Sequence, residues 1–225
     1  MILKRVWKRN KVVFAAIMTI ALPAIADLFA QTLLGFFDML MVSKLGSVAI
    51  SSVGIGNAPM MAVTPIFFAV SIGTTALVSR AYGSKNNEEG KSAMGQSIIL
   101  AIPISLVITI LLFLFNNQIL GLVGRANDMD LQMTKDYYNS VLLGMPFLCF
   151  NVIFFAAYRS ISKANIPMIA NILSIFINIF FNYLMIFTFG WGVLGAGIAT
   201  TISRGAITLI FVCLLYTSDA ADDGE

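Results

Sequence analysis

Six long apolar stretches constrain this chain more than any other feature of its sequence. A helix that crosses a bilayer needs about 20 mostly apolar residues, and each of these stretches is at least that long. They lie at residues 12–42, 48–78, 94–115, 138–158, 166–189 and 193–212. We therefore predict an all-α integral membrane protein, in which residues 1–212 form one bundle of six transmembrane helices.

The composition excludes several function classes. Hydrophobic residues make up 59% of the chain and charged residues only 11%, against about 25% charged in a soluble domain. The formal net charge of +3 is spread too thinly for a nucleic-acid-binding surface. The chain has no His and only two Cys, and no nucleophile–base set stands out. We therefore expect no enzyme activity, no catalytic residue, no cofactor and no nucleic-acid partner, with membrane lipid around the chain.

The positions of Lys and Arg predict the orientation, because these residues gather in cytoplasmic loops. With the N-terminus inside, ten of them precede the first span or fall in the second and fourth loops, and three fall in the first and third loops. The ten are Lys4, Arg5, Lys8, Arg9, Lys11, Arg80, Lys85, Lys91, Arg159 and Lys163, and the three are Lys44, Arg125 and Lys135. We predict a multi-pass protein of the plasma (inner) membrane with a cytoplasmic N-terminus.

The last 13 residues differ from the rest. The apolar pattern stops at Val212, and "CLLYTSDAADDGE" (213–225) resembles the translation of a sequencing-library adapter. We interpret this tail as an artefact rather than a native polar C-terminus, and expect the chain to be a truncated fragment.

A polar stripe runs along the first apolar stretch. Asp27, Gln31 and Asp38 are four and seven residues apart, so on a helix they lie within about 40° of one another. Pro23, on the same helix, removes a backbone N–H and predicts a bend. A carboxylate inside a membrane is costly and usually functional, although Asp38 could instead be a helix-end acid that reaches toward the lipid headgroups.

A second stripe follows on the fifth stretch, where Asn171, Asn178 and Asn182 are seven and four residues apart. Counting from the membrane edges places Asn178, Asn182 and Thr200 of the sixth stretch at the depth of Asp38. These oxygen donors suit Na⁺, or a proton held at Asp38. The alternative for the amides is that they only hold helices together.

Two further features come from the sixth stretch. Arg204 lies near mid-membrane, as Asp27 does, and an ion pair between them would reduce the cost of two buried charges. The glycines of "GVLGAG" (192–197) predict close helix packing rather than nucleotide binding, since no strand–turn–helix context surrounds them.

Several segments in order resemble the multidrug and toxic compound extrusion (MATE) transporters. They are "LPAIADLFAQTLLGFFDMLMVSKLGSVAISSVGIGN", "SIGTTALVSRAYGSKNNEEG" and "NIFFNYLMIFTFGWGVLGAGIATTISR", and the similarity spans Lys8–Val212. The resemblance implies one six-helix lobe of a twelve-helix protein, with the C-terminal lobe missing. It implies export of organic, often cationic, drugs in exchange for Na⁺ or H⁺.

The resemblance also assigns residues. It maps a cation site onto Asp38, Asn178, Asn182 and Thr200, and the bending proline onto Pro23. Gln31 and Tyr137 match cavity-lining positions, and we add Asp27 to the expected cavity. Many prokaryotic members have an acid where this chain has Asn182, which leaves Asp38 as the single acid expected at the site.

The alternatives are a related flippase for lipid-linked saccharides, which a wide basic cavity would favour, and a six-helix membrane enzyme or channel subunit. The lack of His argues against the enzyme, and the lack of a filter-like loop argues against the channel.

Overall fold

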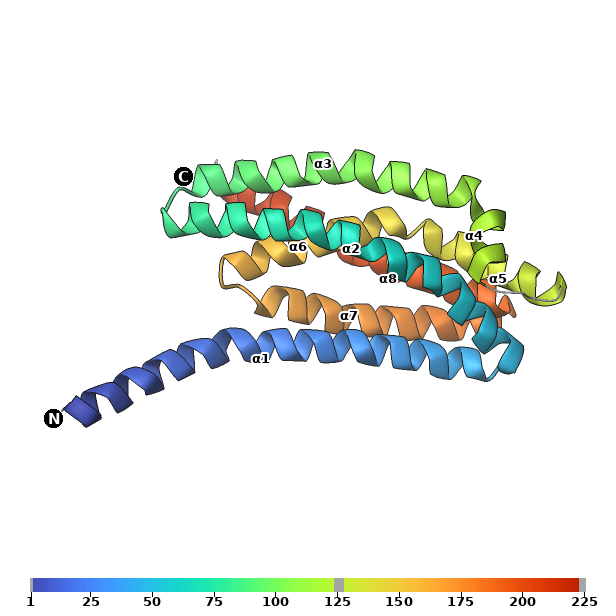
Figure 1. Ribbon diagram of the computed structural model, residues 1–225, viewed down its shortest axis with the longest axis horizontal. Coiled ribbons are helices and arrows are strands. Elements are labelled where there is room, and N and C mark those ends of the chain that lie inside the picture. The colour runs from blue at the N-terminus through green and yellow to red at the C-terminus, as the bar shows by residue number, and fades with distance from the viewer. Residues whose placement is uncertain (1, 124–127, 223–225) are drawn as a thin grey trace.

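The computed structural model of the chain is a bundle of long helices (Figure 1). It describes residues 2–123 and 128–222, without the side chains of 2–13, 15–17, 19–20, 23–24, 27, 87, 128–130 and 216–222. The helices are α1 (Ile2–Ser43), α2 (Ser47–Gly83), α3 (Asn87–Leu114), α4 (Asn116–Val123), α5 (Asp128–Leu142), α6 (Met145–Ser160), α7 (Asn165–Asn182), the π-helix η1 (Tyr183–Thr188) and α8 (Gly192–Asp222).

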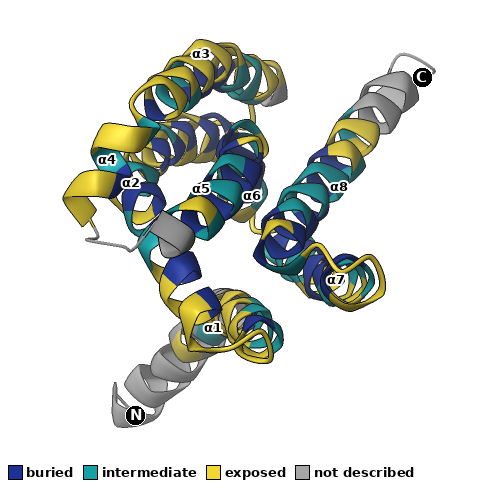
Figure 2. Cartoon of the chain, turned by 90° about the vertical axis from the view of Figure 1, so that its right-hand side faces the viewer, coloured by how far each residue is buried: buried dark blue, intermediate teal, exposed yellow. Residues whose placement is uncertain are grey.

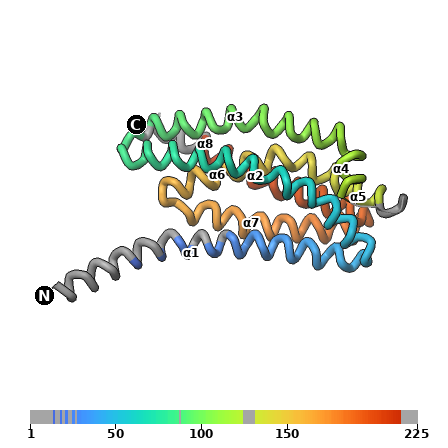
Figure 3. The backbone as a smooth tube through the Cα atoms, viewed as in Figure 1, coloured from blue at the N-terminus to red at the C-terminus, as the bar shows by residue number. Residues whose placement is uncertain are grey.

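Helices that are distant in sequence lie side by side in the bundle (Figure 3). Helix α1 packs along α7, α2 packs between α3 and α6, and α8 packs against both α5 and α7. The first, fifth and sixth predicted spans, which carry the polar stripes, are therefore neighbours.

Four helices of the described part are long and apolar enough to cross a membrane: Ser47–Gly83, Glu88–Leu114, Asn165–Thr188 and Gly192–Leu215. A fifth span is formed if Leu131–Leu142 and Met145–Ser160 are counted as one bent element. In α1 the segment with described side chains, Leu28–Ser43, is shorter. The structure agrees with the all-helical membrane class, and the set of six spans stays a prediction.

The fourth predicted span, 138–158, is not one straight helix. It divides into the end of α5 and most of α6, which meet at an angle of 44°. Pro146 stands in the first turn of α6, where its missing N–H would have no helical partner. Gly144 lies at the break, and a Cβ added there would come 2.8 Å from Thr201 Oγ1. The break thus lets α8 approach closely.

The segment between the third and fourth predicted spans, which we expected to be a loop, is mostly helical. It forms α4 and the first half of α5. Leu120 of α4 is buried and joins the main core, which explains why an apparently polar connection folds back onto the bundle. Helix α8 also continues beyond Val212, as far as Asp222.

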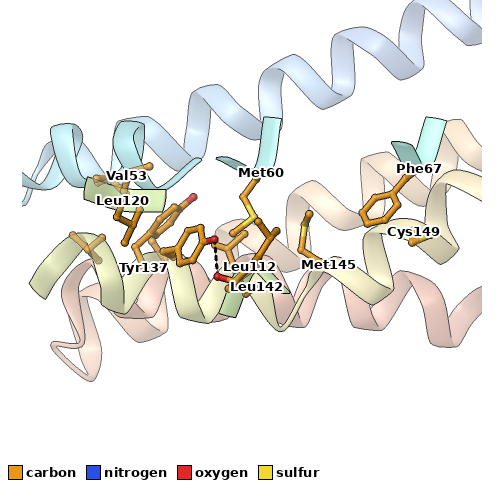
Figure 4. Packing of buried hydrophobic residues seen from close by; sticks show 14 of the residues in the cluster. Val53, Met60, Phe67, Leu112, Leu120, Tyr137, Leu142, Met145 and Cys149 are labelled. Atoms are coloured by element: carbon orange, nitrogen blue, oxygen red, sulfur yellow. Dashed lines mark hydrogen bonds between the residues drawn. The ribbon is translucent and has the colours of Figure 1, made fainter. Parts of the chain in front are cut away.

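Apolar residues fill the interior and also cover much of the outside, and Figure 2 shows the buried and exposed parts of each helix. The core joins α2, α5 and α6 through buried side chains that include Met60, Phe67, Leu142, Met145 and Cys149 (Figure 4). Large apolar side chains such as Phe29, Met61, Ile99 and Leu114 are more than 60% exposed. Such an outer surface suits lipid and would be unfavourable in water.

Glycines set the spacing of α8, as the sequence predicted. A Cβ added at Gly195 would lie 2.9 Å from the backbone carbon of Met185, and one added at Gly197 would lie 2.6 Å from Ser140 Cβ. The Gly195 contact brings α8 close to η1, and the Gly197 contact brings it close to α5.

Candidate functional site

A cavity of about 720 Å³ lies among α1, α2, α5, α6, α7 and α8. Its lining combines apolar side chains with polar groups from each of these helices. The main polar groups are Gln31, Asp38, Asn57, Tyr137, Asn151, Arg159, Asn171, Asn178, Thr200 and Arg204.

The carboxylate of Asp38 is the centre of a hydrogen-bonded cluster. Asn182 Nδ2 donates to Asp38 Oδ1 and, over 2.8 Å, to Asn178 Oδ1. Asn178 Nδ2 lies 3.5 Å from Thr200 Oγ1. The Thr200 hydroxyl is within reach of Asp38 Oδ2 at 3.4 Å and of the Ala196 carbonyl at 3.0 Å. Three helices, α1, α7 and α8, therefore meet at one carboxylate.

Local sequence explains this geometry. Asn178 and Asn182 are four residues apart on α7, so they lie on the same helix face, and both are buried. The π-helix η1 begins immediately after Asn182. Asp38 stands one turn before the end of α1 and is only partly buried, because it faces the cavity.

The cluster has the donor set of a site for a small hard cation. Asn182 Oδ1 is buried and has no hydrogen-bond partner in the described part of the chain. It adds an unused oxygen to those of Asp38, Asn178 and Thr200, and a half-turn of an amide exchanges its oxygen and nitrogen. No group of three or more Cys, Asp and Glu side chains occurs among the described residues. The donor set fits Na⁺ or a proton better than a transition metal.

A second set of hydrogen bonds supports the cavity wall. The Tyr137 hydroxyl donates to Asn57 Oδ1 at 3.2 Å and links α5 to α2. Asn151 Nδ2 donates to the Arg204 carbonyl at 3.0 Å, and Thr208 Oγ1 donates to Asn151 Oδ1 or to that same carbonyl, each at 3.0 Å. These bonds fix the backbone of α8 against α6 beside the Asp38 cluster.

Most sequence-predicted residues whose side chains are described come together here. Asp38, Asn178, Asn182 and Thr200 form the cluster described above, and three others, Gln31, Tyr137 and Asn171, line the cavity.

Thr201, the residue after Thr200, does not join the cluster, and its hydroxyl donates to the Ser140 carbonyl at 2.7 Å. The bend at Pro23 and the cavity position of Asp27 lie outside the described side chains, and so does the Asp27–Arg204 pair.

Sequence reasoning missed Asn57 and Asn151. Each is the single amide of a mainly apolar helix. The amides of α7 were noticed because several of them recur at helical spacing, and Asn57 and Asn151 have no such neighbours. Arg204 lines the cavity and interacts electrostatically with Asp38 and Tyr137. Its Nη1 atom is buried and has no hydrogen-bond partner among the described residues.

Known proteins share this sequence and fold. The chain is 31% identical over 202 residues to a probable multidrug resistance protein NorM of Thermotoga maritima, covering 87% of this chain and 43% of that protein. It is 26% identical over 201 residues to the multidrug export protein MepA of Staphylococcus aureus, covering 89% of this chain and 44% of MepA. The chain therefore spans less than half the length of these relatives.

A solved structure is similar to this chain in fold. It is an outward-facing multidrug resistance MATE transporter, similar with a TM-score of 0.84 and 25% identity over 91% of this chain and 45% of that one. The family model MatE matches residues 23–184, which contain the Asp38 end of α1, all of α2 to α7 and the start of η1. This chain belongs to the MatE family.

Proposed function

We propose that this chain is the N-terminal lobe of a cation-coupled antiporter, which exports organic, cationic compounds by alternating access. The observation that carries the proposal is the Asp38 carboxylate, held by Asn182 and Thr200 on two other helices beside the unpartnered Asn182 Oδ1. The coupling ion is Na⁺ or H⁺. The lobe lies in the plasma membrane with its N-terminus in the cytoplasm and works with a C-terminal lobe of the same chain.

Asp38 would take the cation from outside. A proton would neutralise its carboxylate directly, and Na⁺ would be held by that carboxylate together with the oxygens of Asn178, Asn182 and Thr200. Either cation changes the bonds that join α1 to α7 and α8, because Asn182 and Thr200 both contact Asp38. Coupling requires that the cation bind two conformations with different affinity, and a bend of α1 at Pro23 would supply the second conformation.

The charge of the cation explains why cargo leaves. Cation uptake at Asp38 makes the cavity one unit more positive. At an effective dielectric constant of about 20, two like charges about 8 Å apart repel by about 2 kcal/mol. A cationic cargo in the same cavity would then be released outward, which is the sign of coupling that an exchanger needs.

The direct test is Asp38→Asn in the full-length transporter. We expect loss of cation-driven export, down to the level of cells without the protein, with normal membrane insertion. The matched control is Asp136→Asn on α5, because Asp136 is an acid outside the cavity lining, with its carboxylate bonded to Gln132. Drug resistance that survives Asp38→Asn would exclude this assignment. Export driven separately by Na⁺ and pH gradients identifies the ion.

The second candidate is a flippase for lipid-linked saccharides. Two guanidinium groups in the cavity lining, Arg159 and Arg204, favour it because arginine binds phosphate well. Transport of a labelled lipid-linked saccharide that ignores an imposed cation gradient would select the flippase.

A further inference from the structure

Arg204 is an ionisable residue of the cavity lining to which neither the cation cluster nor the hydrogen-bonded wall gives a role. It follows Thr200 by four residues on α8, so its side chain stands on the same helix face, one turn deeper. Its Nη1 atom is buried without a hydrogen-bond partner among the described residues. A guanidinium nitrogen that is buried without an acceptor is costly, which calls for a functional reason.

Arg204 is a positive charge in the same cavity lining as Asp38, close enough to favour the ionised form of its carboxylate. The two side chains line one cavity and interact electrostatically, yet the hydrogen bonds of Asp38 go to Asn182 and Thr200. Two positive charges can therefore balance the Asp38 carboxylate. One is a cation bound in the oxygen-rich cluster, and the other is the guanidinium of Arg204 on α8.

We propose that Arg204 is a resident counter-cation of the Asp38 site: its guanidinium competes with the coupling cation for the Asp38 carboxylate and so sets how tightly that cation is held. This inference rests on the proposed function. The cluster residues bind the cation, and Arg204 weakens that binding.

Asp38 and Arg204 stand on different helices, so the competition between Arg204 and the cation depends on how these helices are arranged. The Arg204 backbone is tied to α6 through Asn151, while Asp38 stands on α1, which packs mainly along α7. A movement of α1 would change the Asp38–Arg204 separation and leave Arg204 in place. The arginine then favours cation release in the conformation that brings Asp38 closest, and an exchanger needs such release on one side of the membrane.

The size of the effect follows from the charge separation. Thr200 Oγ1 lies 3.4 Å from Asp38 Oδ2, and side chains four residues apart on a helix are about 6 Å apart at Cβ. Two unit charges about 6 to 10 Å apart, at an effective dielectric constant of about 20, change a binding constant about 10- to 100-fold. Removing the Arg204 charge should tighten cation binding by that factor.

The experiment measures equilibrium binding of ²²Na⁺ to the purified full-length transporter at fixed pH. We expect Arg204→Gln to bind Na⁺ about 10- to 100-fold more tightly than the unmodified protein. Arg204→Lys keeps the charge and should stay near the unmodified value, even if packing changes. Arg80→Gln removes an arginine at the exposed end of α2, outside the cavity lining, and should have no effect.

If the coupling ion is a proton, the measurement is a pH titration of the infrared band of the Asp38 carboxyl group. That band is identified by its loss in Asp38→Asn. Its midpoint should move about one to two pH units upward in Arg204→Gln, because a proton also binds more readily once the neighbouring positive charge is gone.

Unchanged or weaker cation binding in Arg204→Gln, beside a folded Arg204→Lys, would overturn the inference and leave the Asp38 assignment standing. Cation binding that survives Asp38→Asn would overturn the proposed function itself.

Discussion

Among single residues, Asn182 distinguishes this site from one with two acids. Its amide nitrogen bonds both Asp38 and Asn178 and joins α1 to α7 without any cation. Replacing Asn182 by Asp would remove both bonds and place a second carboxylate against Asp38. We expect a loss of about 1–3 kcal/mol of stability at neutral pH in the absence of Na⁺. Added Na⁺ should restore much of it, because a ligand that binds the folded state stabilises it.

Thermal unfolding of the purified full-length protein, measured over a series of Na⁺ concentrations, would check this expectation. Asn171→Asp is the matched control, since Asn171 lines the same cavity from α7 but is not part of the Asp38 cluster. Equal Na⁺ dependence in the two variants would contradict a special role for position 182.

At the scale of elements, the approach of α8 to its neighbours depends on two glycines. A methyl group at Gly197 would overlap Ser140 of α5, and one at Gly195 would overlap the backbone of Met185. We expect Gly197→Ala to destabilise the protein by about 1–3 kcal/mol and to reduce transport, because α8 also carries Thr200 and Arg204.

Gly73→Ala in α2 is the comparison, since open space surrounds that position and alanine is the better helix former. It should leave the melting temperature unchanged or slightly higher. A melting temperature equal to that of the unmodified protein for Gly197→Ala would mean that α8 can shift outward at little cost.

These helices also show which features of the site can be predicted from the sequence and which cannot. Helical spacing placed Asn178 and Asn182 on one face, and counting depth placed Thr200 beside Asp38, because straight helices preserve both relations. The α5–α6 break was missed, since Pro146 reads the same inside a span and in the first turn of a new helix. Tyr137–Asn57 was missed as a pair because its partners are 80 residues apart and only tertiary packing brings them together.

At the scale of the whole molecule, the polar groups of the cavity lie inside the bundle. Apolar side chains form the core and are also exposed on the outside. The cavity is lined by residues from six helices, whereas many large apolar side chains are exposed on the helices. A membrane surrounds such a bundle at no cost in unpaired polar groups. The distribution of charge at the helix ends then decides which way the bundle is inserted.

The orientation prediction can be tested at the turns between helices. With a cytoplasmic N-terminus, Lys44 between α1 and α2 faces the outside, and Lys85 between α2 and α3 faces the cytoplasm. In a Cys213→Ser background, which removes the exposed thiol of the adapter-like tail and keeps the buried Cys149, a membrane-impermeant maleimide should label Lys44→Cys in intact cells. Lys85→Cys should react only after the cells are opened. The reverse pattern would invert the topology, place the Asp38 cluster in the inner half of the membrane, and require the cation to enter from the cytoplasm.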